Sequence, residues 1–144
     1  MSCTGSAPNR LCLTTDPVFT LSQTADVNHA LVYGGEYQSP GVHYNQDPLC
    51  AVCRSPRPSS LMVPGTNVCP TGWTLEYAGY IMASRDNHVA GSEFVCVDPK
   101  MEARPGSDGS LPASELWYSA TVCGSLPCPP YEGGKVVLCA VCTK

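Results

Sequence analysis

Hydrophobic and polar residues alternate over short stretches of this chain, and residues typical of turns separate these stretches. The clearest stretch covers residues 73–82. Its Trp73, Leu75 and Tyr77 alternate with polar residues, which is the period of two expected for a half-buried β-strand. Gly79 then interrupts the alternation, and an isolated glycine inside a strand predicts a bulge.

Further stretches have the composition and the length of short strands. No segment keeps hydrophobic residues at helical spacing for three turns, so helices are not expected. We therefore predict a mostly β protein with much coil. The predicted strands cover residues 30–33, 36–38, 49–54, 60–63, 73–82, 93–97, 116–122 and 135–142.

A five-residue sequence, Leu-Cys-Ala-Val-Cys, occurs twice, at residues 49–53 and 138–142. Each copy follows an apolar-Cys-apolar element, centred on Cys12 for the first copy and on Cys96 for the second. This repeat predicts two related units within one compact domain, with the two copies in equivalent strands. The predicted units are a truncated first unit at residues 1–57 and a second unit at residues 58–144.

The composition is that of a crosslinked extracellular domain. Ten cysteines in 144 residues, with only 14% charged residues, predict a small disulfide-rich protein of an oxidising compartment, and so a secreted one. The net charge of −4 and the scattered basic residues argue against a nucleic-acid partner. No hydrophobic run is long enough to span a membrane.

The two Cys-x-x-Cys pairs could also hold zinc, which four thiolates bind in a tetrahedral site. Both pairs enclose Ala-Val and follow Leu, as in a buried strand. Residues three apart in a strand point to opposite faces, so we expect each cysteine of a pair to bond to a separate partner and expect no cofactor. Correspondence between the units then predicts the pairs Cys12 with Cys53, Cys96 with Cys142, Cys3 with Cys50, Cys69 with Cys139, and Cys123 with Cys128.

Several longer motifs make the chain similar to a known family. They are Leu-Met-Val-Pro-Gly at residues 61–65, Cys-Pro-Thr-Gly-Trp at 69–73, Leu-Glu-Tyr-Ala-Gly-Tyr at 75–80, Glu-Phe-Val-Cys-Val-Asp at 93–98, Val-Cys-Gly-Ser-Leu-Pro-Cys-Pro-Pro-Tyr at 122–131 and Leu-Cys-Ala-Val-Cys at 138–142. Over about residues 10–144 the chain resembles the non-collagenous C-terminal domain of sponge short-chain collagens, which also occurs in secreted proteins of other marine invertebrates. The resemblance implies an extracellular matrix, adhesion or recognition role. The chain has no Gly-x-y repeat and nothing before Cys12 that corresponds to residues 69–93, so a role in building collagen fibres is not expected.

Aromatic residues are the best candidates for ligand binding. Tyr and Trp combine an apolar face, on which sugars can stack, with a polar group, whereas the alternative of core packing is expected for Trp73. Trp117→Ala should abolish binding to a neutral polysaccharide if Trp117 lies on such a surface. The candidate ligand-binding residues are Trp117, Tyr118, Tyr131 and Tyr44.

A weaker candidate is a cation site formed by Asp86, His88 and Glu93, since a histidine and carboxylates can hold a metal. The alternative, which we favour, is that His88 only forms a hydrogen bond with Glu93 and fixes a loop.

The chain contains no nucleophile elbow, zinc-protease motif, phosphate-binding loop or dinucleotide fingerprint, so we do not expect an enzyme. The leading hypothesis is a secreted, lectin-like recognition domain that binds glycans or matrix polymers. The first alternative is a structural matrix module that self-associates as a homo-oligomer. The second is a small secreted hydrolase.

Overall fold

The computed structural model describes residues 9–19, 32–41, 43–89 and 91–144. These residues form six β-strands and no helix, and coil makes up most of the rest. The prediction of a small, mostly β, disulfide-rich protein is therefore confirmed. The strands are β1 (Gly35–Tyr37), β2 (Ser60–Pro64), β3 (Thr74–Ala83), β4 (Val95–Val97), β5 (Ser114–Tyr118) and β6 (Leu138–Thr143).

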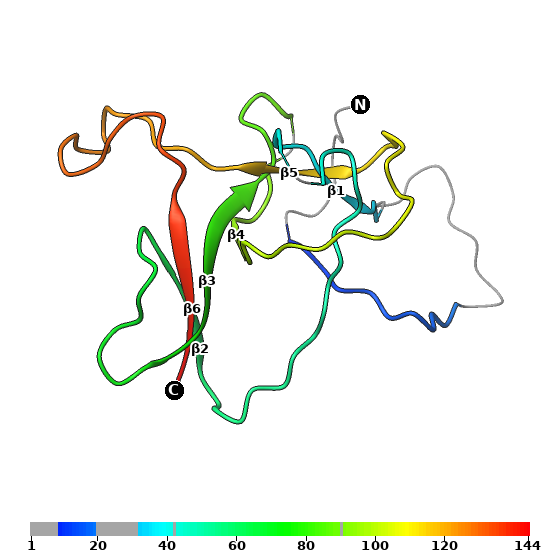
Figure 1. Cartoon of the computed structure of the whole chain (residues 1–144), viewed down its shortest axis with the longest axis horizontal. Helices are drawn as coiled ribbons and strands as arrows, with labels where there is room; N and C mark the ends of the chain where they lie inside the picture. Colours follow the sequence, from blue (N-terminus) through cyan, green and yellow to red (C-terminus); the bar gives the residue numbers. More distant parts are fainter. Residues whose placement is uncertain (1–8, 20–31, 42, 90) are drawn as a thin grey trace.

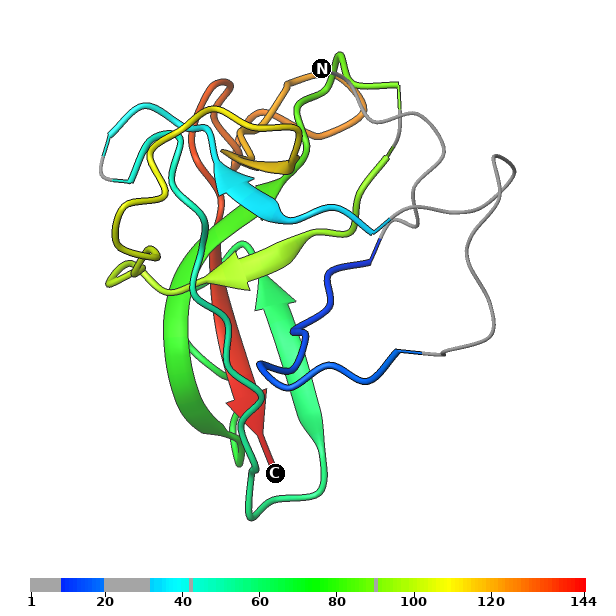
Figure 2. The same ribbon diagram turned by 90° about the vertical axis from the view of Figure 1, so that its right-hand side faces the viewer.

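The strands pair into one mixed sheet in the order β1-β5-β3-β6-β2, and β4 pairs with β3 off this path. Antiparallel β2, β6 and β3 run side by side, vertically in Figure 1, while β5 and β1 lie across their upper end. Figure 2 shows how strongly β3 curves between these two parts of the sheet. The pairing of β1 with β5 is parallel, and every other pairing is antiparallel.

The alternation at residues 73–82 does correspond to a strand, because β3 covers nearly the same residues. The bulge, however, lies between Leu75 and Tyr77 and not at Gly79, which is in register with Cys139 of β6. A Cβ atom on Gly79 would lie 2.0 Å from the carbonyl oxygen of Val97 in β4. Gly79 is therefore required by the close approach of β4 to β3.

One predicted strand is absent from the structure, and the described part of another is coil. Residues 49–54 lie outside every described strand and are exposed, so the prediction that both Leu-Cys-Ala-Val-Cys copies occupy equivalent strands is wrong. Between described residues, no backbone hydrogen bond involves residues 51–54. Of the predicted strand at 30–33, residues 32 and 33 are coil, and the first two lie outside the described residues.

Four disulfides link the described residues, and they differ from the predicted set in a systematic way. Cys123–Cys128 is confirmed. Cys12 bonds to Cys50, not to Cys53. In the predicted second unit, Cys96 likewise bonds to Cys139 and not to Cys142, and Cys69 bonds to Cys142 and not to Cys139. Cys53 has no disulfide partner among the described residues, and the predicted partner of Cys50, Cys3, lies outside them.

The antiparallel register explains why the predicted pairing was wrong. The first half of β3 lies beside the end of β6, with Leu75 opposite Cys142, so the turn that carries Cys69 is close to Cys142. The second half of β3 pairs with β4 and lies beside the start of β6, which brings Cys96 to Cys139. As predicted, the two cysteines of β6 reach separate partners.

The hydrophobic core is small and lies where the two parts of the sheet meet. Tyr37 of β1, Met82 of β3 and Leu116 of β5 are buried against each other, and partly buried side chains from β4 and β5 pack around them. Cys139, Ala140 and Cys142 are fully buried in β6. With so little apolar volume enclosed, the disulfides are expected to supply much of the stability.

Candidate ligand-binding surface

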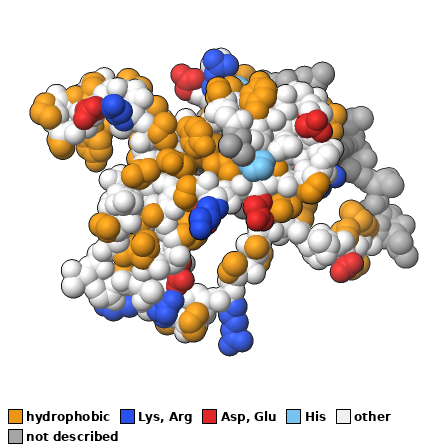
Figure 3. All heavy atoms as spheres, in the orientation of Figure 1, with side chains coloured by type: hydrophobic (Ala, Val, Ile, Leu, Met, Phe, Trp, Pro, Cys, Tyr) orange, Lys and Arg blue, Asp and Glu red, His pale blue; other side chains and the backbone are white. Residues whose placement is uncertain are grey.

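The segment between β5 and β6, residues 119–137, projects from the upper left of the molecule in Figure 1. We call it the β5–β6 excursion. Its two ends pair through Ala120 and Val136. Its far end is closed by the Cys123–Cys128 disulfide, and Figure 3 shows that its visible surface carries mostly apolar side chains with few charges.

Hydrogen bonds make the excursion a well-defined structure although it contains no strand. The backbone of Thr121 donates to Lys135 at 3.0 Å and accepts from Gly134 at 2.8 Å. The Thr121 hydroxyl also donates to the carbonyl oxygens of Glu132 and Lys135. These bonds hold the two sides of the excursion together, and the backbone N–H of Tyr131 donates to Pro127 at 3.3 Å.

Tyr131 lies in a groove of about 240 Å³ between the excursion and Gly65, the residue after β2. Its side chain is 42% exposed. Glu132 and Lys135 line the same groove and form an exposed ion pair, with Nζ and Oε2 3.7 Å apart. The groove therefore places an accessible aromatic ring beside one hydrogen-bond acceptor and one donor that remain open to solvent. The remaining lining residues are Thr121, Pro130, Val136, Val137 and Leu138.

Trp117 is in a different environment, because its polar group and one face are already engaged. Its Nε1 donates to Oε2 of Glu115 at 2.7 Å. The guanidinium carbon of Arg85 lies 5.2 Å from the centre of its ring, which is within the range of a cation–π interaction. The indole therefore has little surface to offer a sugar.

The other two predicted residues also lie outside the Tyr131 groove. Tyr118 is partly buried and packs against Tyr80 edge to face, with ring centres 5.3 Å apart. Burial is the main reason why the pKa of Tyr118 is raised above its ordinary value. Tyr44 is 51% exposed, but it is not among the residues that line the groove.

The structure does not bring Asp86, His88 and Glu93 together as a metal site, and the described residues contain no group of three His, Cys, Asp or Glu side chains suited to an ion. His88 instead lies against Glu115, with Nε2 and Oε2 3.4 Å apart. Glu115 therefore joins His88 to Trp117 across the loop after β3. The expected contact of His88 with Glu93 is replaced by one with a strand that is distant in sequence.

Sequence reasoning identified Tyr131 but not the residues that form the groove around it. Thr121, Glu132 and Lys135 carry no motif, and their spacing has no strand or helix period. The useful signal was the pair of cysteines at 123 and 128 followed by two prolines. Such a segment predicts a closed, rigid loop, but it does not predict which side chains the loop turns toward its neighbours.

The four disulfides suit an oxidising compartment such as the extracellular space. Within the ranges that the structure describes, no helix is both long and apolar enough to cross a membrane.

The chain matches no protein-family model, no curated protein and no solved structure. The resemblance to the C-terminal domain of sponge short-chain collagens therefore stays a prediction.

Proposed function

We propose that this protein is a secreted recognition domain that binds neutral glycans through the Tyr131 groove. The observation that carries the proposal is the exposed ring of Tyr131 in a groove that also presents the Glu132 and Lys135 side chains. A sugar ring can stack its C–H face on tyrosine while its hydroxyl groups form hydrogen bonds with a nearby carboxylate and ammonium group.

The rigidity of the groove supports this function. The excursion is closed by a disulfide and held by the hydrogen bonds of Thr121. Binding therefore does not have to order the loop, which would otherwise lower the affinity. The groove is small, so affinity at a single site should be modest. Presentation of several copies would raise it without new contacts.

The proposal shifts the centre of the predicted surface from Trp117 to Tyr131. Trp117 is held by Glu115 and covered on one face by Arg85, so Trp117→Ala is expected to affect the local packing more than the binding.

The test is binding of the intact protein to an array of neutral oligosaccharides and polysaccharides, followed by titration of the best ligand. Tyr131→Ala should weaken binding about two- to tenfold or more, because aromatic contacts contribute roughly 0.5–1.5 kcal/mol beyond their buried area. Tyr131→Phe should retain most of the affinity, since it keeps the ring. Tyr44→Ala is the matched control, because Tyr44 is an equally accessible tyrosine outside the groove.

The proposal is wrong if Tyr131→Ala and Tyr44→Ala bind the ligand equally well, or if no glycan binds. A protein that binds nothing on the array but forms oligomers as its concentration rises would favour the structural module. Release of reducing ends from a bound polysaccharide would favour the hydrolase.

A further inference from the structure

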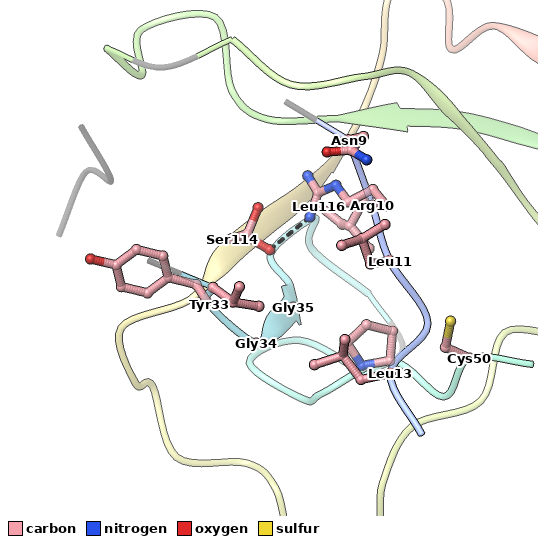
Figure 4. A pocket seen from close by; sticks show the side chains of 12 residues that line it. Asn9, Arg10, Leu11, Leu13, Tyr33, Gly34, Gly35, Cys50, Ser114 and Leu116 are labelled. Atoms are coloured by element: carbon pink, nitrogen blue, oxygen red, sulfur yellow. Dashed lines mark hydrogen bonds between the residues drawn. The ribbon is translucent and has the colours of Figure 1, made fainter. Parts of the chain in front are cut away.

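A second cavity lies beside β1 and β5, away from the β5–β6 excursion. It has a volume of about 260 Å³ and lies between residues 9–13, the chain that leads into β1, and β5 (Figure 4). Its walls are mostly apolar. Leu11, Leu13 and Val32 line it and are largely exposed, while Leu116 of the core closes its inner side.

Arg10 is the one charged side chain among the described residues that line this cavity. Its Nη1 donates to the carbonyl oxygen of Ser114 at 3.0 Å, and its Nη2 donates to that of Glu115 at 2.9 Å. These bonds fasten residue 10 to β5 and hold the guanidinium at the cavity wall, as Figure 4 shows for Ser114.

The charge of Arg10 is not balanced by an acid among the described residues. None of the ion pairs between them includes Arg10, and its buried Nε has no hydrogen-bond partner. Burial lowers the pKa of Arg10 from its ordinary value. A partly buried cation without an anionic partner costs free energy, which an anionic ligand in the cavity would offset.

We propose that this cavity binds a small carboxylate with an aliphatic body. Arginine pairs well with carboxylates because its planar group matches the two carboxylate oxygens. The leucine and valine side chains would remove the aliphatic body from water, as in other small-molecule sites, which combine apolar walls with few polar groups. The volume is below that of a typical drug-sized site, so the ligand is small.

The probe is hexanoate, compared with 1-hexanol, which has the same chain length and no charge at neutral pH. Calorimetric titration of the intact protein should give at least about tenfold tighter binding for hexanoate, because hydrogen bonds to charged groups are the stronger class. Arg10→Gln should reduce this preference to less than about twofold. Arg54→Gln, which changes an exposed arginine outside the cavity, should leave it unchanged.

Because Arg10→Gln could also loosen residues 9–13, a second variant tests the same site from its rim. Leu13 is 71% exposed, so Leu13→Asp should fold normally. It should weaken hexanoate more than 1-hexanol through charge repulsion. Three results would overturn the proposal. The first is equal affinity of the wild-type protein for the two probes, and the second is an unchanged preference in Arg10→Gln. The third is no binding of hexanoate at millimolar concentration.

Discussion

Glu76, at the bulge of β3, connects two segments that are distant in sequence. Its Oε1 accepts hydrogen bonds from the Thr143 hydroxyl at the end of β6 and from the guanidinium of Arg57, which precedes β2. Arg57 Nε also donates to Thr143. The hydrogen bond from Thr143, followed by that from Arg57, lowers the pKa of Glu76 from its ordinary value of 4.5.

This lowered pKa predicts an acid-sensitive contribution to stability. Because the folded state favours the carboxylate, the contribution is fully present above the unfolded-state pKa and is lost as pH falls through the folded value. The denaturant midpoint of the wild type should therefore fall more steeply below about pH 4.5 than that of Glu76→Gln. Glu102→Gln is the control, since Glu102 is exposed and its described hydrogen bond uses the backbone carbonyl. Parallel curves for the wild type and Glu76→Gln would contradict the prediction.

Gly79 provides a second prediction about a single residue. A methyl group there would overlap the carbonyl group of Val97, so Gly79→Ala should lower the free energy of unfolding by about 1–3 kcal/mol, as overpacking does. Gly109→Ala is the matched control, because a Cβ at residue 109 meets nothing within 4 Å. Chemical denaturation of both variants checks this, and equal midpoints would show that β4 can move away without cost.

Among the structural elements, the clearest contrast is between β6 and residues 49–53, which share the same five residues. In β6 they lie between β2 and β3 and are largely buried. In the first copy Val52 is 86% exposed, and no described strand pairs with it. The strand conformation therefore depends on neighbouring strands more than on the sequence itself, as is general for β-structure.

The disulfides nevertheless join equivalent cysteines in the two copies of the repeat. Cys12–Cys50 matches Cys96–Cys139, and the remaining bridge of the second unit, Cys69–Cys142, would match a bond between Cys3 and Cys53. We predict that bond. It is within reach, because the nine residues from Cys3 to Cys12 can span about 30 Å, whereas Cys50 to Cys53 spans at most about 11 Å.

Peptide mapping without reductant tests the predicted bond. The expected results are a peptide pair joined through Cys3 and Cys53 and no alkylation of the intact protein before reduction. Alkylation of Cys53, or a bond from Cys53 to a second copy of the chain, would contradict the prediction and would favour self-association. Cys123 and Cys128, which are bonded in the structure, provide the internal control for complete oxidation.

At the scale of the whole molecule, the sequence predicted properties that depend on local pattern. The alternation around Trp73, Leu75 and Tyr77 predicted the central strand, the lack of helical spacing predicted the β class, and the density of cysteines predicted the disulfide crosslinks. Disulfide partners, which depend on how neighbouring strands are aligned, could not be predicted from a local sequence pattern. The partner of Cys142 follows from the direction in which β3 passes β6, and no local pattern contains that direction.

The same limit applies to the candidate sites. Tyr131 was recognisable as an aromatic residue beside a closed loop, but Gly65, which lies far from it in the sequence, also lines its groove. Arg10 was not recognised, because an isolated arginine has no motif. Its importance comes from burial against the carbonyl groups of β5, which only the assembled fold creates.

The position of β6 in the middle of the sheet has a consequence for biosynthesis. Cys69 and Cys96 leave the ribosome before β6, which carries both of their partners. At about 5–20 residues per second, the 43 residues that separate Cys96 from Cys139 correspond to a delay of roughly 2–9 seconds. During this time the two thiols can bond only to wrong partners. These two native bridges, and the pairings of β6 with β2 and β3, must therefore form after β6 has been synthesised.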